Sequence, residues 1–312
     1  MISLGIDTSN YTTSCALYDS ETASVIQKKM LLPVKEGEKG LRQSDAVFHH
    51  TRQLNAVISE LFSEFTGEID IIGVSSRPRS IEGSYMPCFT VGLNAASILS
   101  SVMKKPLYEF SHQEGHIAAA AFSAERLDLL SSPFIAFHVS GGTTEALLVE
   151  PGVENIIRER IIGKTNDLNC GQAIDRCGVM LGLPFPCGVA LEELAARSDK
   201  EFTPKISVTD GNCNLSGLEN QCEKMLKSGE RKEDIAKYCL SFVTGTIRKM
   251  TGHCISEYGA LPVLYAGGVM SDKLIKDALS AEFDAYFAAP EFSCDNAAGV
   301  AVLSYLKDKN NA

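Results

Sequence analysis

Two histidines, His112 and His116, lie four residues apart in the sequence His-Gln-Glu-Gly-His. On a helix, residues at this spacing project from one face, one turn apart, so two imidazoles can bind one metal ion. A remote carboxylate can supply a third ligand and leave coordination positions open for water or substrate. Asp295, in the sequence Ser-Cys-Asp-Asn, is the candidate for that carboxylate. We therefore predict a working metal site rather than a structural one.

Two other interpretations of the histidine pair exist. One is an ordinary helix that carries two half-buried histidines. The other is a zinc peptidase, whose pattern H-E-x-x-H places a glutamate directly after the first histidine as general base. Gln113 occupies that position here and the acid is Glu114, so we do not expect peptidase chemistry. The adjacent histidines His49 and His50 point apart and are predicted to lie on the surface.

Two glycine-rich turns follow predicted strands, at 140–144 and at 266–269. Paired glycines let backbone N–H groups close on an anion, and a helix that begins after the turn favours negative charge. A hairpin turn that only needs positive φ is the alternative for either turn alone. Two such turns in one chain favour a nucleotide site.

Two aspartates lie beside these predicted elements. Asp7, at the end of the first predicted strand, is either a carboxylate that positions a metal or water, and so a possible catalytic residue, or a strand-end cap. Asp175, near the start of a predicted helix, either accepts hydrogen bonds from a ribose or only complements the helix dipole.

The elements that must position these residues repeat along the chain. Ahead of the histidine helix, hydrophobic periodicity predicts strands at 2–8, 14–18, 25–32, 69–74 and 106–110. It predicts helices at 50–65 and 91–103. The pattern then restarts, with predicted strands at 134–139, 145–149, 155–162, 261–265 and 285–288. Predicted helices follow at 171–181, 235–258, 273–279 and 295–306. Each half opens with a strand, a polar or glycine-rich turn and a strand. This duplication is typical of the actin-like ATPase fold, in which two related α/β domains surround a nucleotide and metal cleft. We predict that the first domain comprises residues 1–108 plus 290–312 and that the second comprises residues 109–289.

The composition narrows the class of protein. A chain of 312 residues with 45% hydrophobic and 22% charged residues is typical of a soluble globular protein with two domains. The net charge of -10 argues against nucleic-acid binding through the electrostatic field of the whole protein. RNA could still be bound through a local basic patch or delivered by a basic partner protein. The ten cysteines are scattered and the sequence has no signal-peptide pattern, so we predict free thiols and a cytoplasmic location. No apolar run is long enough to span a bilayer, so we expect no membrane partner.

Seven motifs occur in the order and at the approximate spacing found in the TsaD family, once labelled O-sialoglycoprotein endopeptidases. They begin at Leu4, His112, Val139, Gly171, Pro186, Ala266 and Asp295. The chain resembles this family over nearly its whole length. The resemblance implies the actin-like ATPase (ASKHA) fold and transfer of a threonylcarbamoyl group from an adenylate to the adenosine beside the anticodon of tRNA. It identifies the chain as an N6-threonylcarbamoyladenosine synthase-type acyltransferase that needs no protein nucleophile.

The resemblance also implies ligands. One divalent metal, iron or zinc, would be held by His112, His116 and Asp295, and would act as Lewis acid and template for the carbamoyl phosphate anhydride. The predicted residues for binding adenine nucleotide or threonylcarbamoyl-adenylate are Ser140, Gly141, Gly142, Thr143, Asp175, Gly188, Gly267, Gly268 and Asp272. Within this set the phosphate is expected at the 140–142 turn and the ribose at Asp175 and Gly188.

Several positions depart from the family pattern. Family members usually continue the first motif with Cys-Asp-Glu-Thr, whereas residues 10–13 of this chain are Asn-Tyr-Thr-Thr and lack both acidic residues. The asparagine that usually follows Ala-Gly-Gly-Val is replaced by Asp272. We therefore interpret the chain as a diverged paralogue. Alternatives are a carbamoyl transferase with another acceptor or a non-catalytic nucleotide-binding partner subunit. Expected partners are the adenylate, tRNA delivered with partner proteins, and a TsaB-like or TsaD-like protein in a hetero-oligomer.

Overall fold

The computed structural model describes residues 1–9, 11–33, 41–293 and 297–311. The chain divides into two compact units. Unit 1 comprises Met1–Ser131, Glu150–Glu159 and Glu291–Ala312, and unit 2 comprises Ser132–Val149 and Arg160–Pro290. Unit 1 therefore includes residues 109–131, which the sequence-based boundaries assigned to the second domain, because the helix of the two histidines packs against elements of the first sheet and the C-terminal helix.

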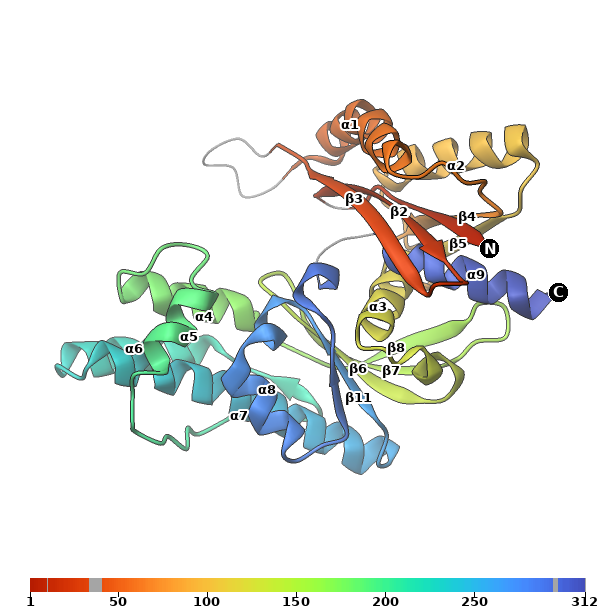
Figure 1. Cartoon of the computed structure of the whole chain (residues 1–312). Coiled ribbons are helices and arrows are strands. Elements are labelled where there is room, and N and C mark those ends of the chain that lie inside the picture. Colours follow the sequence, from red (N-terminus) through yellow and green to blue (C-terminus); the bar gives the residue numbers. More distant parts are fainter. Residues whose placement is uncertain (10, 34–40, 294–296, 312) are drawn as a thin grey trace. The chain divides into compact units, whose positions relative to one another are not determined.

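Unit 1 is built on a five-stranded sheet in the order β3-β2-β1-β4-β5 (Figure 1). Its strands are β1 (Ile2–Asp7), β2 (Thr12–Asp19), β3 (Ser24–Leu31), β4 (Ile71–Arg77) and β5 (Leu107–Ser111). The first three strands are antiparallel, whereas β4 and β5 run parallel to β1. Its helices are α1 (Gln43–Ser63), α2 (Phe89–Met103), α3 (His112–Ser123), the short 3-10 helices η1 (Leu127–Ser131) and η3 (Pro290–Phe292), and α9 (Ala298–Asn311).

Alternation along β1 sends its side chains to two different helical layers. Leu4 and Ile6 are buried in a cluster with residues of α1 and α2. Gly5 faces the other way, where a Cβ atom would lie 2.8 Å from the backbone nitrogen of Ala301 in α9. The missing side chain lets α9 lie directly against the sheet. Figure 1 shows α1 and α2 on one side of this sheet and α9 on the other.

Unit 2 repeats this topology. Its sheet has the order β12-β11-β6-β7-β8, formed by β6 (Phe134–Val139), β7 (Thr144–Pro151), β8 (Ile157–Lys164), β11 (Val263–Ala266) and β12 (Ala285–Phe287). Counted in chain order within each five-stranded sheet, the strands of both sheets have the arrangement third, second, first, fourth, fifth. The internal duplication predicted from the sequence is confirmed.

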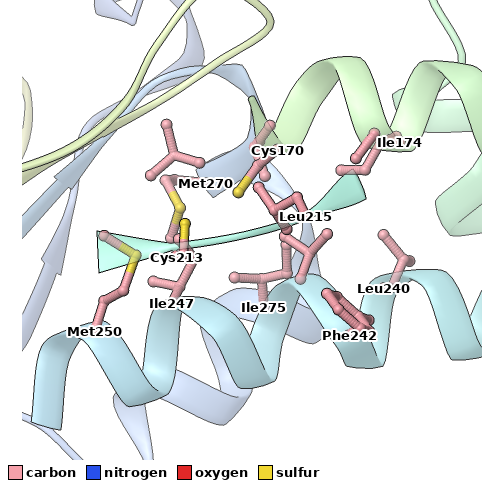
Figure 2. Close-up of a cluster of buried hydrophobic side chains, with 14 of the residues drawn as sticks. Cys170, Ile174, Cys213, Leu215, Leu240, Phe242, Ile247, Met250, Met270 and Ile275 are labelled. Atoms are coloured by element: carbon pink, nitrogen blue, oxygen red, sulfur yellow. The ribbon is translucent and has the colours of Figure 1, made fainter. Parts of the chain in front are cut away.

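The helices of unit 2 enclose a large apolar core. They are α4 (Cys170–Met180), α5 (Gly188–Ala195), α6 (Ser216–Lys227), α7 (Lys232–Tyr258), α8 (Lys273–Ser280) and the 3-10 helix η2 (Gly268–Ser271); a two-stranded ribbon pairs β9 (Val208–Thr209) with β10 (Asn212–Cys213). Figure 2 shows Cys170 and Ile174 of α4 pointing toward side chains of α7, with Cys213 and Met270 between them. The burial of each large apolar side chain stabilises the folded state by roughly 1.5–3 kcal/mol, so this cluster holds α4 and α7 together.

Two further sequence predictions can be compared with the described part of the chain. None of its helices is long and apolar enough to cross a membrane. Nine cysteines fall within it, and all nine are free thiols that are buried in the protein.

Candidate functional site

Helix α3 begins at His112, directly after β5, and a capping box fixes its first turn. The Ser111 hydroxyl accepts a hydrogen bond from the Glu114 backbone N–H (3.1 Å), and the Glu114 carboxylate accepts one from the Ser111 N–H (2.6 Å). The two imidazoles then project from one side of the helix, with their Nε2 atoms 2.9 Å apart. The two histidines therefore converge as the four-residue spacing predicts.

The buried carboxylate of Asp7 holds the first of these imidazoles. Its Oδ2 lies 2.8 Å from Nδ1 of His112 and also accepts a hydrogen bond from the Ser75 hydroxyl (3.1 Å). The backbone N–H of Ser9 donates to Oδ1 (2.7 Å). A proton on Nδ1 is thereby directed to Asp7, which leaves the Nε2 lone pair on the side of His116. Metal-binding histidines are oriented by a carboxylate in the same way.

The histidine pair fits a metal as two of its ligands. Two Nε2 atoms that bind one tetrahedral zinc ion at ~2.1 Å lie roughly 3.4 Å apart, so the rings need to separate by only about half an ångström. The third predicted ligand, Asp295, lies outside the described residues. Within the described ranges, no group of three or more His, Cys, Asp or Glu side chains is arranged to hold a metal ion.

Ser9 completes a serine–histidine–aspartate group, but its geometry differs from a nucleophilic triad. The Ser9 hydroxyl lies 2.9 Å from Nδ1 of His112, the nitrogen that also contacts Asp7, and 3.5 Å from Nε2. A triad needs the serine and the aspartate on different nitrogens, so that the proton can pass through the ring. This arrangement therefore positions His112 and does not activate Ser9.

Glu114 is fully buried and its hydrogen bonds are structural. Besides the cap, its carboxylate accepts hydrogen bonds from the Ser80 hydroxyl (2.7 Å) and the Asn155 amide (2.9 Å), and Arg77 lies 3.8 Å away. Its negative charge, together with burial, raises the pKa of the neighbouring Glu159 carboxyl, with burial the larger cause. These contacts join residues from three separate segments, 77–80, 111–114 and 155–159, and sequence reasoning did not find Ser80, Asn155 or Glu159.

We expect Glu114→Ala to lower the free energy of unfolding by about 3 kcal/mol, because it leaves the helix cap and the buried donors around the carboxylate without their partner. Glu114→Gln should lower it by only about 1 kcal/mol, since the amide retains an acceptor. Urea denaturation measures both changes. The exposed Glu154→Ala is the control and should stay within about 0.5 kcal/mol of wild type; a Glu114→Ala protein as stable as this control would contradict the role given to the buried carboxylate.

His50 corrects a sequence prediction. Helix α1 begins at Gln43 rather than near the histidines, so His50 lies inside the helix on its buried face. Its Nδ1 is 2.8 Å from the Thr13 hydroxyl of β2, and the side chain is fully buried. The prediction that His49 and His50 both lie on the surface was wrong for His50, because the start of the helix was placed too late.

Unit 2 contains a cavity of about 280 Å³ that gathers much of the predicted nucleotide-binding set. The predicted residues that line it are Ser140, Gly141, Asp175, Gly188, Gly268 and Asp272. Gly142, Thr143 and Gly267 are described but are not among its lining residues. Glu192 of α5 also lines it, and sequence reasoning missed this residue.

The Ser140 turn is closed by its own side chain. The hydroxyl accepts hydrogen bonds from the backbone N–H groups of Gly142 (3.2 Å) and Thr143 (3.1 Å). The N-terminus of α4 lies against this turn, with the Gly171 N–H donating to the Ser140 carbonyl (3.1 Å). A Cβ atom at residue 171 would lie 2.6 Å from the Gly141 nitrogen, so only glycine allows this approach. The N–H groups of the first turn of α4 are bonded within the protein, and the positive end of the helix dipole beside the glycine turn is what suits an anion.

Gly267 has a packing role in the structure. Its φ is +102°, and a Cβ atom there would overlap the backbone carbonyl of Val139 in β6. The glycine therefore lets the ends of β11 and β6 come together and places the next residue, Gly268, at the cavity wall.

The cavity has three carboxylates in its lining: Asp175, Glu192 and Asp272. Oδ1 of Asp175 accepts a hydrogen bond from the Cys187 N–H (2.8 Å), which ties α4 to the start of α5. Asp272 is the N-cap of α8, and burial, reinforced by the charge of Glu192, raises its pKa to about 6. Such acceptors suit the hydroxyl and amine donors of a nucleoside.

Comparisons with known proteins show which family the chain belongs to. The family model described as TsaD, tRNA N6-adenosine threonylcarbamoyltransferase, matches residues 31–302. A tRNA N6-adenosine threonylcarbamoyltransferase of Persephonella marina is 30% identical over 99% of this chain and 90% of its own length. A probable bifunctional tRNA threonylcarbamoyladenosine biosynthesis protein of Thermoplasma acidophilum is 28% identical over 99% of this chain, which spans only 57% of that relative.

A solved structure shows the fold. Component A of the (R)-2-hydroxyglutaryl-CoA dehydratase of Acidaminococcus fermentans superimposes with a TM-score of 0.56 at 17% identity, covering 99% of both chains. Together with the repeated sheet topology, this likeness identifies the fold as the predicted actin-like ATPase fold.

Proposed function

We propose a reaction for this chain, which belongs to the TsaD family, the tRNA N6-adenosine threonylcarbamoyltransferases. The chain transfers a threonylcarbamoyl group from an adenylate to the adenosine beside the anticodon of tRNA, and the transfer depends on one divalent metal, iron or zinc. The observation that carries the metal dependence is the pair of Nε2 atoms 2.9 Å apart, one of them on a ring held by Asp7. Asp295 is proposed as the third ligand.

The chain's own residues would bind and orient the reactants. A bound metal would supply a Lewis acid and a template for the carbamoyl phosphate anhydride. The backbone of the Ser140–Gly141 turn, beside the positive end of the α4 dipole, would hold the adenylate phosphate. Asp175 and Gly188 would hold the ribose. Ser9 and Asp7 would keep His112 in position, and no side chain is needed as a nucleophile.

We expect Asp7→Asn to lower the affinity for Fe²⁺ or Zn²⁺ by roughly 10–100-fold, because the neutral amide orients His112 less firmly and makes it a weaker ligand. Competition against a chromophoric chelator measures the affinity of the purified protein. Asp70→Asn is a matched control in the same unit, since Asp70 only accepts from the Ile2 N–H and pairs with Lys105. Equal affinities for Asp7→Asn and wild type would contradict the orienting role.

The transferase reaction can be tested with purified components. The chain is loaded with Fe²⁺ or Zn²⁺ and mixed with threonylcarbamoyl-adenylate, unmodified tRNA and the partner proteins of a characterised family member. Nucleoside mass spectrometry should detect threonylcarbamoyladenosine that depends on the chain and disappears after chelation. Product that forms equally well with metal-free protein would rule out metal dependence.

The acidic lining of the cavity favours a second candidate, a non-catalytic nucleotide-binding partner subunit. Asp272 and Glu192 both lie at the wall where the adenylate would bind. Under this hypothesis the chain would raise the yield of a complete family enzyme while forming no product alone. Adding the chain to such an enzyme, with His112→Ala as comparison, separates the two hypotheses: a non-catalytic subunit should tolerate that substitution.

A further inference from the structure

Two carboxylates of the chain already occupy backbone donors at the N-terminus of α8. Oε1 of Glu192 accepts a hydrogen bond from the Lys273 N–H (2.9 Å), and Oδ1 of Asp272 accepts one from the Ile275 N–H (3.0 Å). A helix N-terminus normally attracts an anion through these N–H groups. Here the chain supplies the anions itself, so this part of the cavity presents acceptors to a ligand and not donors.

The surrounding charges strengthen this effect. The third carboxylate of the lining, Asp175, comes from α4, and of the residues described around the cavity none is a lysine or an arginine. On α8, Lys273 is exposed and contributes its backbone N–H, while Nζ of Lys276 lies 5.7 Å from the centre of the Phe287 ring. The α7 residue in the lining is the neutral Leu240. No cation in the described lining offsets the negative charge at α8.

Burial makes one of the two α8 carboxyls sensitive to added charge. Asp272 is only 8% exposed, and its pKa of about 6 reflects burial first and the nearby Glu192 second. Another anion brought close would raise that pKa further. Asp272 is therefore mostly ionised at pH 7.5 and mostly protonated at pH 5.5, where it repels an anion less.

We propose that Asp272 and Glu192 form a charge filter that admits the unphosphorylated nucleoside end of an adenylate and excludes adenine nucleotides carrying a second phosphate on the ribose. The inference rests on the proposed function, which places the adenylate in this cavity. In this arrangement the single phosphate would lie at the Ser140 turn, and the ribose held at Asp175 and Gly188 would share the cavity with the carboxylates of Asp272 and Glu192. A 2′- or 3′-phosphate meets fixed negative charge at that position, and like charges in contact disfavour binding strongly.

Isothermal titration calorimetry of the full chain tests the filter with AMP, adenosine 3′,5′-bisphosphate and adenosine 2′,5′-bisphosphate as probes. At pH 7.5, the wild type should bind AMP at least about tenfold more tightly than either bisphosphate. Asp272→Asn should reduce this ratio by about tenfold, because asparagine removes the charge and remains a good N-cap for α8. Glu192→Gln should change the ratio in the same direction.

The pH dependence gives a second readout. The ratio for the wild type should fall as the pH is lowered from 7.5 to 5.5, through the pKa of Asp272 near 6. The bisphosphates also take up protons in this range, so Asp272→Asn serves as the control and should show a smaller fall. If the wild type binds AMP but the ratio is the same in Asp272→Asn and Glu192→Gln, the filter is overturned while the adenylate cavity stands. If neither the wild type nor Asp272→Asn binds any of the three probes, both the filter and the proposed adenylate cavity are overturned.

Discussion

His112→Ala and His116→Ala are each expected to lower the affinity for Fe²⁺ or Zn²⁺ by more than about a hundredfold. Each substitution removes a direct ligand, and changing a partner that only orients a ligand already costs 10–100-fold. The loss should be greater than that of Asp7→Asn, because Asp7 acts on the metal through His112. Metal content of the purified proteins and chelator competition measure the effect, and threonylcarbamoyl transfer should be lost with the metal.

The substitution needs a control on another histidine of the same unit. His49→Ala changes a half-buried imidazole of α1 that is not part of the proposed site, so its metal affinity should equal that of the wild type. Circular dichroism and urea denaturation should confirm that all three variants remain folded. Full metal occupancy in folded His112→Ala or His116→Ala protein would contradict the site.

The second large effect is expected from Gly171→Ala. Its Cβ atom would lie 2.6–2.8 Å from three backbone atoms of the turn, the nitrogen and Cα of Gly141 and the carbonyl carbon of Ser140. Backbone atoms cannot move aside as a flexible side chain can, so the turn and α4 must separate. We expect a loss of about 2–3 kcal/mol in the free energy of unfolding. The affinity for AMP should fall at least about tenfold, because the anion site is made of the two elements that separate.

Gly252→Ala is the matched control in the same unit. Gly252 lies inside α7, where an added Cβ atom meets nothing within 4 Å. Alanine is the better helix former, so this variant should be more stable than the wild type by up to about 1 kcal/mol, with unchanged AMP affinity. Gly171→Ala protein that matches Gly252→Ala in both stability and affinity would show that the close approach has no functional role.

The fold could be predicted because its signals are local and repeated. Each sheet begins with an apolar strand, a polar or glycine-rich turn and a second strand, and this pattern recurs within about 130 residues in the sequence. The convergence of the two histidines also follows from one local rule, the 3.6-residue period of a helix. Periodicity therefore sufficed for the architecture and for the convergence of two of the three proposed metal ligands.

The contacts that give the sites their chemistry are not local. Asp7 and His112 are separated by 105 positions in the sequence, and nothing in either segment specifies that Oδ2 meets Nδ1. Glu192 was missed because α5 has only eight residues and its acid resembles any exposed helix position. Its role depends on α8, 81 positions later, whose first N–H it caps.

Glycines illustrate the same limit. Paired glycines at 267–268 and 141–142 look alike in the sequence and predict the same anion-binding use. In the structure, Gly267 is required by strand packing, whereas Gly141 lines the cavity and Gly171 sets the distance between turn and helix. Only the coordinates of the neighbouring backbone distinguish a glycine that faces a ligand from one that faces another strand.

Metal-dependent threonylcarbamoyl transfer to tRNA can be tested by complementation in a living cell. The chain is expressed in a bacterial strain depleted of its own family enzyme, and threonylcarbamoyladenosine is measured in total tRNA by mass spectrometry, with His112→Ala expressed to the same level for comparison. The wild type should restore the modified nucleoside, and His112→Ala should not. Equal amounts of the nucleoside with both proteins, or none with folded, metal-loaded wild type supplied with the family's partner proteins, would contradict it.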